Sequence, residues 1–177
     1  MNKSKRLKYS EVRARVERSH QMVLGQTQGL GTIQINLLIK YNAWLMQELL
    51  NKGLEDFGLT APAYIAMTMI NSSTDHTANP SDLSLCTGET RANMTRICDD
   101  LVAQGLLQRV TSPVDRRRID LSLTEKGLDL LKDVMPKIRE KNRKIFSVFS
   151  DDERESLEKS LLKLVNVIES MSKSAES

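Results

Sequence analysis

The sequence has very few of the residues from which catalytic and metal centres are built. It contains two cysteines and two histidines among 177 residues. Cys86 and Cys98 stand twelve positions apart, which matches neither a Cys-x-x-Cys pair nor a zinc-ligand pattern, and His20 and His76 are isolated in the chain. Covalent catalysis needs a nucleophile next to a base, and no motif supplies one. We therefore expect a protein that is not an enzyme, with no metal, no cofactor and two reduced thiols.

Long apolar runs are also missing. The longest are only a few residues, whereas a membrane-spanning helix needs about 20. The first residues are basic, and no apolar stretch follows them within the length of a signal peptide. We therefore expect a cytoplasmic protein with no membrane partner. Its length and its 40% apolar content fit a single folded domain.

The basic residues are unevenly placed along the chain. The net charge of +3 is too small to indicate nucleic-acid binding by itself. However, the first 20 residues carry seven basic side chains against two acidic ones, and three consecutive arginines, Arg116, Arg117 and Arg118, follow Asp115. We interpret residues 1–30 as a basic N-terminal extension.

The three arginines stand at the tip of a predicted β-hairpin. Leu107, Arg109 and Thr111 alternate with Gln108 and Val110. Apolar and polar residues alternate over 119–123, and the two segments together have the period of a half-buried antiparallel pair. Pro113 and Asp115 indicate the turn between them. We expect the apolar residues of the second strand to face the core and Asp120 to face outward. A hairpin with arginines at its tip has the shape and charge to enter a groove of DNA.

Two short helices precede the hairpin. Asn79 and Pro80 predict the start of a helix over about 80–86, which Gly88 ends. Thr90 caps a second helix, whose apolar positions 94, 97, 98 and 101 fall on one face. A short helix, a tight turn and a second helix with a polar, exposed N-terminal end form a helix-turn-helix, in which the second helix lies in the major groove. With the hairpin, the sequence predicts a winged helix-turn-helix over residues 58–124.

Long helices flank this region, so the predicted fold class is mainly α (α+β). We expect them over about 32–56, from Thr124 onward and from Ser150 onward, with apolar residues every three or four positions. Such stripes are typical of seams between helices. The helix-turn-helix cannot cover all of them, so we expect a homodimer, with packing inside one chain as the alternative. The predicted dimerisation region spans residues 31–57 and 125–177, with the candidate contact residues Leu38, Leu45, Leu157, Leu161, Leu164 and Ile168.

Two sequence motifs carry a family resemblance. Residues 90–101 read Thr-Arg-Ala-Asn-Met-Thr-Arg-Ile-Cys-Asp-Asp-Leu, and residues 115–127 read Asp-Arg-Arg-Arg-Ile-Asp-Leu-Ser-Leu-Thr-Glu-Lys-Gly. With the order of the helices, they resemble the MarR family of transcriptional regulators over about residues 30–172, and the Pro-Ser-Asp-Leu run from Pro80 is similar to the branch that represses multidrug-efflux operons. The resemblance implies a homodimer, entwined through its terminal helices, on a pseudo-palindromic operator in double-stranded DNA.

The resemblance also implies which residues contact DNA. In the recognition helix, Arg91 is long enough to reach a guanine edge and Asn93 can pair with adenine, since these side chains match the donors and acceptors of those bases. The other candidates, which suit phosphates or bases, are Thr90, Thr95 and Arg96. Asp99 and Asp100 argue that only the first two turns touch DNA. We expect these two aspartates to pair with arginines of the wing or of their own subunit.

In the wing, the family's Asp-x-Arg pattern falls on Asp115 and Arg117. Asp115 would orient the Arg117 guanidinium, which the resemblance places in the minor groove, where A·T tracts concentrate negative potential. Arg116 and Arg118 alternate along the hairpin, so at most one of them shares that groove. The other is expected to hold a phosphate or an internal ion pair.

Members of the family commonly sense small amphipathic molecules, often aromatic acids, in a cleft between the dimerisation helices and the DNA-binding lobe. Methionine and aromatic side chains give an adaptable apolar wall for such effectors. A helix face that contains methionine is, however, more often part of the core. The candidate lining residues are Trp44, Met46, Tyr64, Met67, Met94 and Met135.

Two other functions stay open at this stage. A redox-sensing regulator of the same fold would use Cys86 or Cys98, although Cys98 is predicted on a buried helix face and Cys86 has no basic neighbour in sequence. A helical interaction protein without DNA binding would carry the same charges as a solvated surface. Operator binding with a steep salt dependence separates the second alternative from a DNA-binding regulator.

Overall fold

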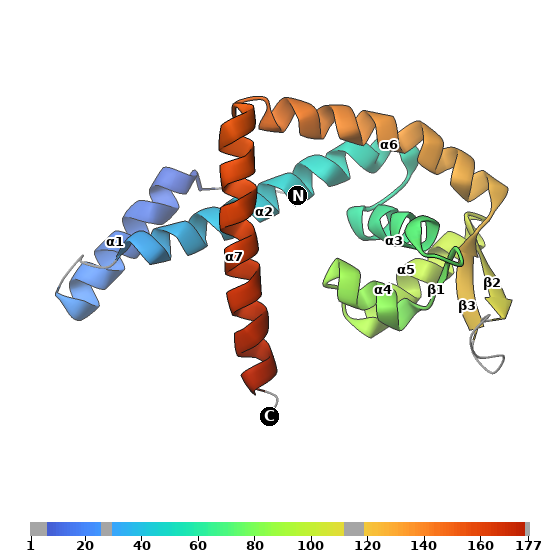
Figure 1. The fold of residues 1–177 in the computed structure, drawn as a ribbon, viewed down its shortest axis with the longest axis horizontal. Helices are drawn as coiled ribbons and strands as arrows, with labels where there is room; N and C mark the ends of the chain where they lie inside the picture. Colours follow the sequence, from blue (N-terminus) through green and yellow to red (C-terminus); the bar gives the residue numbers. More distant parts are fainter. Residues whose placement is uncertain (1–6, 26–29, 112–118, 176–177) are drawn as a thin grey trace, which may run out of the picture.

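The computed structural model describes residues 7–25, 30–111 and 119–175, and these form one lobe with long helical arms (Figure 1). The arms are α1 (Tyr9–Leu24), α2 (Leu30–Leu54), α6 (Glu125–Phe146) and α7 (Asp151–Ala175). The lobe contains α3 (Ala61–Ser72), α4 (Pro80–Thr87), α5 (Arg91–Ala103) and three short strands, and a 3₁₀ turn, Glu55–Phe57, connects α2 to it. The helices predicted from 32, 60, 80, 90, 124 and 150 are all present.

Side-chain caps set where the helices of the lobe begin. Thr60, Asn79 and Thr90 each accept a hydrogen bond from a backbone N–H in the first turn of the helix that follows, which satisfies one of its free donors. Gly88 ends α4 with φ +73°, a left-handed conformation that glycine adopts at little cost. The turn from Gly88 to Thr90 therefore fixes how α5 leaves α4.

The core lies inside the lobe, where α3, α4, α5 and the sheet meet the ends of α2 and α6. Its largest fully buried apolar side chains are Leu54, Met67, Ile70, Leu83, Met94, Leu101, Leu107, Leu121, Leu131 and Val134. Each fully buried side chain of this size stabilises the fold by about 1.5–3 kcal/mol relative to an exposed one. The core therefore joins the lobe to the ends of α2 and α6, while the rest of the arms lies outside it.

The sheet confirms the predicted hairpin and adds a strand to it. Strand β2 (Leu107–Thr111) pairs antiparallel with β3 (Ile119–Leu123), and β1 (Thr77–Ala78) pairs with the other edge of β3. The sequence patterns did not predict strand β1. Only two residues pair, and their partner lies more than 40 positions away, so no local pattern marks β1.

The prediction that Asp120 faces outward is also wrong. Asp120 is 2% exposed, whereas Ile119 is half exposed. Ile119 pairs with the last residue of β2, so it lies at the outer end of the hairpin and beyond the core. Asp120 instead packs beside Met69 of α3 and Leu83 of α4, because β1 and its flanking segment cover that side of β3.

The N-terminal segment, which we expected only as a basic extension, contains a regular helix. Helix α1 packs antiparallel on the first half of α2, as the left side of Figure 1 shows. The Tyr9 and Tyr41 rings lie 5.6 Å apart, and Gln34 donates from Nε2 to Oε1 of Glu17 at 2.8 Å. These contacts stabilise α1 as part of the arm.

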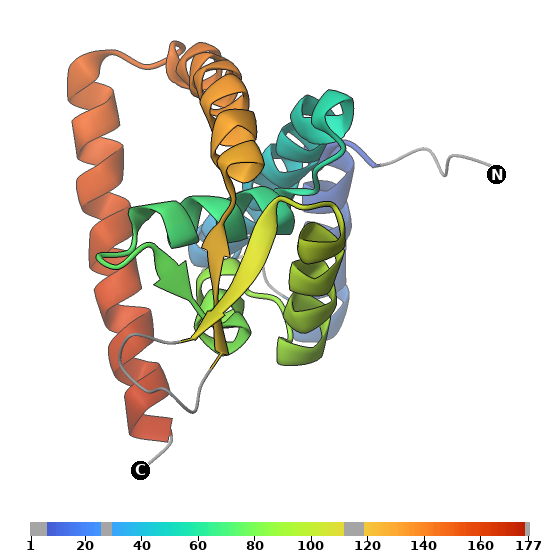
Figure 2. The ribbon, with the colours of Figure 1, turned by 90° about the vertical axis from the view of Figure 1, so that its right-hand side faces the viewer.

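No described part of the chain covers helix α7. Every described side chain along it is exposed, including Leu157, Leu161, Leu164 and Ile168. It crosses α2 in Figure 1, but the turned view of Figure 2 shows the two helices well apart. Exposed apolar surface of this extent marks an interaction site.

Gly127→Ala should lower the stability of the lobe. A Cβ at this position would lie 2.1 Å from the Leu106 carbonyl oxygen, and a backbone atom cannot turn aside as a side chain can. Overpacking of this kind costs about 1–3 kcal/mol, which urea denaturation at one fixed protein concentration can measure. Gly31→Ala is the matched control, since nothing lies within 4 Å of its added Cβ. Equal stability of the two variants would contradict the packing described for Gly127.

Candidate nucleic-acid interface and cavity

Helix α5 has one buried face and one exposed face. Met94, Ile97, Cys98 and Leu101 are buried, which confirms the predicted inner face. The Thr90 hydroxyl oxygen accepts from the Asn93 backbone N–H at 3.2 Å and starts the helix. Because the inner face is anchored in the core, the opposite face is presented outward at a fixed angle to the lobe.

The predicted DNA-contacting residues of α5 lie on this outer face. Thr90, Arg91, Thr95 and Arg96 are exposed, and Asn93 is half-buried at the edge of the helix. Thr95 donates its hydroxyl hydrogen to the Arg91 carbonyl at 2.9 Å. Its hydroxyl oxygen therefore remains an acceptor, which suits a base amino group rather than a phosphate.

Asp99 and Asp100 each pair with an arginine of the same subunit, as the sequence predicted. Asp99 accepts from Arg109 of β2 at 2.5 Å, and Asp100 accepts from Arg96 at 3.4 Å. Exposed pairs of this kind contribute only about 0–1 kcal/mol to stability. The pair with Arg109 links α5 to β2, the first strand of the wing. Arg109 was not among the residues predicted from the sequence.

The wing residues Asp115, Arg116, Arg117 and Arg118 lie outside the described residues. The strands on either side of them are described, and they run out from the lobe beside α5 (Figure 2). The structure therefore positions the base of the wing. The roles of its four tip residues stay predictions.

A hollow of about 700 Å³ lies between α2, α3 and α6. Its wall is mainly apolar and includes two of the six predicted effector residues, Met46 and Tyr64. Three lysines also line it: Lys52 near the end of α2, and Lys141 and Lys144 on α6. An apolar cavity with a few basic groups at its wall suits an amphipathic anion.

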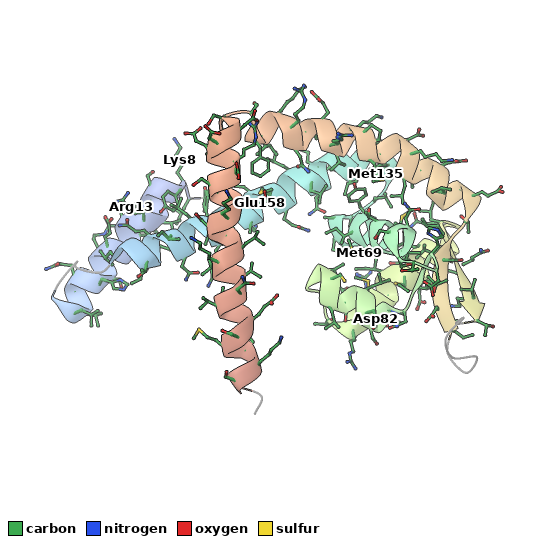
Figure 3. All side chains as sticks on the ribbon, viewed as in Figure 1. Lys8, Arg13, Met69, Asp82, Met135 and Glu158 are labelled. Atoms are coloured by element: carbon green, nitrogen blue, oxygen red, sulfur yellow. The ribbon has the colours of Figure 1, made fainter. Side chains whose placement is uncertain are left out.

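The other four predicted effector residues lie elsewhere. Met67 and Met94 are completely buried in the core of the lobe, so the prediction that they line an effector cleft is wrong. Trp44 on α2 and Met135 on α6, the latter labelled in Figure 3, are partly exposed and lie outside the wall of the hollow. Methionines in the sequence indicate which face of a helix is apolar. Because both the core and a cavity wall are apolar, they do not indicate which of the two that face lines.

The two cysteines have different surroundings. Cys98 is buried, and desolvation together with the negative charge of Asp99 raises its thiol pKa to about 11. Cys86 is exposed beside a hollow that contains Asp75, Asp82 and Asp120. Asp82, labelled in Figure 3, accepts from the Asn79 side chain at the start of α4. Neither thiol therefore has the basic surroundings of a reactive cysteine.

Across residues 7–25, 30–111 and 119–175, no three His, Cys, Asp or Glu side chains gather in a way that could hold a metal ion. Within the same described ranges, no helix has an apolar stretch long enough to span a bilayer.

Comparison with known proteins identifies the family. The model of the MarR family matches residues 57–118. The transcriptional repressor MprA of Escherichia coli K12 is 35% identical over 121 residues, which cover 68% of this chain and 69% of MprA. The chain belongs to the MarR family of transcriptional regulators. This confirms the resemblance seen in the two motifs, and it confirms that the chain is a regulator and not an enzyme.

Solved structures of MarR regulators share the fold. A cysteine-to-serine mutant of MarR from Escherichia coli in complex with operator DNA aligns with a TM-score of 0.67 at 22% identity, over 78% of this chain and 99% of that one. CouR from Rhodococcus jostii RHA1 bound to p-coumaroyl-CoA aligns with a TM-score of 0.67 at 21% identity, over 78% and 95%. The predicted winged helix-turn-helix with long terminal helices is therefore confirmed.

The raised pKa of Cys98 predicts two very different thiols in the folded MarR regulator. Near pH 8, about one in a thousand Cys98 side chains is a thiolate, because that pH lies about three units below the pKa. A thiol-specific disulfide reagent should therefore modify one cysteine per chain rapidly, and Cys86→Ser should abolish that phase. Cys98 should react only after unfolding in urea. Rapid labelling of folded Cys86→Ser would contradict the burial of Cys98.

Proposed function

We propose that this MarR-family protein is a homodimeric repressor that binds a pseudo-palindromic operator and is released from it by a small amphipathic anion. The observation that carries the proposal is the outer face of α5, which presents Arg91, Thr95 and Arg96 beside the base of the wing. MprA, which is similar over two thirds of its length, is named a transcriptional repressor. We propose a multidrug-efflux operon as its target, because its motifs resemble those of the branch of the family that represses such operons.

The homodimer is proposed from the exposed apolar stripes. On α7 these are the exposed side chains Leu157, Leu161, Leu164 and Ile168. On α2, Leu38 is exposed and Leu45 is half-buried. Covering such side chains with a partner would stabilise the assembly by about 25 cal/mol for each Å² of apolar surface removed from water. A second copy of the chain supplies matching helices, so residues 31–57 and 125–177 form the proposed dimerisation region. Two lobes held in this way would present two recognition helices to successive major grooves.

Leu161→Asp should weaken the dimer strongly. The substitution puts a charge into the centre of the α7 stripe, where pairing with a second copy would bury it. Leu162→Asp is the matched control, because Leu162 is exposed on the same helix and lies off the stripe. Sedimentation should show monomers for Leu161→Asp at concentrations where the wild type and Leu162→Asp are dimers. A dimeric, folded Leu161→Asp protein would contradict the proposed interface.

Operator binding should respond differently to the two kinds of arginine. Arg91→Ala should relax discrimination at one position of each half-site, by about 1–3 kcal/mol if Arg91 makes a bidentate guanine contact. Arg117→Ala should weaken binding on every sequence and lower the log-log salt slope by about one for each phosphate that is no longer neutralised. Affinities across a salt series, on the intact operator and on single-base variants, measure both effects. Unchanged affinity of Arg117→Ala, with an equal decrease on all sequences for Arg91→Ala, would contradict both assignments.

The effector class is proposed from the hollow between α2, α3 and α6. Its apolar wall, with Met46 and Tyr64, would cover an aromatic body, and the three lysines would meet an acidic group. CouR, which shares the fold, is bound to p-coumaroyl-CoA, an aromatic anion. Such a ligand releases the operator only if it binds more tightly to a dimer whose two lobes are wrongly spaced for DNA than to the dimer that fits the operator.

Lys141→Gln should raise the concentration of an aromatic carboxylate, such as salicylate, that half-releases the operator. Removal of one charge-assisted hydrogen bond predicts an increase on the order of tenfold. Lys132→Gln is the control, since Lys132 is exposed on α6 and pairs with Asp129 outside the hollow. Operator release is measured by fluorescence anisotropy. Equal release curves for both variants would place the effector elsewhere.

A further inference from the structure

The Asn93 side chain is held between two charged side chains on the outer edge of α5. Its Nδ2 donates to Oε2 of Glu89 at 2.6 Å, and its Oδ1 accepts from Nη2 of Arg96 at 3.1 Å. The three side chains lie along one edge of the helix, in the wall of a hollow of about 500 Å³ between α5, the start of α3 and the end of α2. The ends of the Asn93 amide therefore have partners of opposite charge.

This arrangement allows only one orientation of the amide. An ionised carboxylate can only accept hydrogen bonds, and a guanidinium can only donate them. Turning the amide over would set its NH₂ group against the Arg96 guanidinium and its oxygen against the Glu89 carboxylate, which breaks both bonds. A free asparagine must select the correct orientation when it binds, whereas Asn93 already has it.

The hydrogen-bonding groups of the Asn93 amide that remain available are complementary to one base, adenine. One N–H and one lone pair of the side chain make no hydrogen bond to any described residue. Together they are a donor next to an acceptor, which is the pattern that pairs with N7 and the N6 amino group of adenine. The two charged neighbours thus leave available the two groups that reading adenine requires.

Glu89 is itself held in place by the turn before the helix. Its backbone N–H donates to the Thr87 hydroxyl oxygen at 3.4 Å, and the left-handed Gly88 directs the chain from α4 into α5. The residue immediately precedes the Thr90 cap, one turn before Asn93. A carboxylate at the N-terminal end of a helix is also favoured by the helix dipole. The Glu89 carboxylate therefore reaches Asn93 from a fixed backbone position.

We infer that Glu89 is a positioning residue for sequence readout, which presets Asn93, together with Arg96, to recognise an A·T base pair. The inference rests on the proposed operator binding and adds a specificity determinant to it. Glu89 carries a charge of the same sign as the DNA phosphates, so it weakens attraction to every sequence alike. Its contribution to the choice between bases comes only through the amide that it orients.

The test compares base preference, not affinity. Binding constants are measured on the operator and on variants with one base pair changed in each half-site, for wild type, Asn93→Ala, Glu89→Ala and Glu89→Gln. Asn93→Ala should abolish a preference for A·T at one position, roughly 5- to 150-fold in the wild type. Glu89→Ala should reduce the same preference at the same position by at least about threefold. Adding Glu89→Ala to Asn93→Ala should reduce it no further.

Two variants separate orientation from charge. Glu89→Gln removes the charge but keeps an acceptor oxygen at the same reach, so the preference should stay within about twofold of the wild type. Glu55→Ala removes a carboxylate that lines the same hollow but is not a partner of Asn93, whose two side-chain partners are Glu89 and Arg96. It should leave the preference unchanged. Circular dichroism confirms that each variant is folded.

The outcomes are distinct. The inference is overturned if Glu89→Ala or Asn93→Ala keeps the full A·T preference, or if Glu89→Gln reduces it as much as Glu89→Ala does. It is also overturned if Glu55→Ala reduces the same preference, because charge and not orientation would then be the cause. A wild-type protein with no preference at any position would instead contradict the proposed operator binding itself.

Discussion

The architecture depends on a simple geometric constraint: the chain has more apolar helix surface than its own core can cover. The lobe buries one face of α3, α5 and the sheet, together with the ends of α2 and α6. The rest of α2 and all of α7 extend beyond it and leave apolar side chains such as Ile35 and Ile168 exposed. Folded proteins rarely expose such surface, so the arms, and not the lobe, are the part of the chain for which we propose a partner.

This division separates two tasks in the molecule. The lobe fixes the geometry of the DNA-binding surface through buried contacts of α5, and the pair between Asp99 and Arg109 links α5 to β2. The arms would determine the distance between two such lobes. The hollow with Lys52 and Lys141 lies where α2 and α6 meet α3, which is the junction between arm and lobe. A ligand in that hollow contacts both parts, so it can favour one spacing of the lobes over another.

Much of the fold could be predicted because the signals for it are local. Thr60, Asn79, Thr90, Thr124 and Ser150 each precede a helix that begins at the next residue. The period-two pattern on either side of Pro113 predicted both long strands of the hairpin. The two motifs indicate the family through their residues and their order along the chain.

The remaining features depend on contacts between distant residues, which local patterns do not show. Strand β1 exists because Thr77 and Ala78 pair with the edge of β3. The segment that contains β1 also covers the side of β3 on which Asp120 is buried. Met67 and Met94 were predicted in an effector cleft but lie in the core, since periodicity shows that a face is apolar and not what it contacts. Glu89 and Arg109 were missed because their importance comes from their partners, Asn93 and Asp99.

The most direct test of the central claim is the mass of the protein bound to its operator. Genomic fragments captured by the purified protein supply the operator sequence, and sedimentation of a duplex of about 30 base pairs with a titrated amount of protein gives the stoichiometry. We expect two chains on each pseudo-palindromic site, which bind as a pair, so that no complex with a single chain forms at any point of the titration. A single chain bound stably to each duplex, with full affinity and sequence preference, would contradict this expectation.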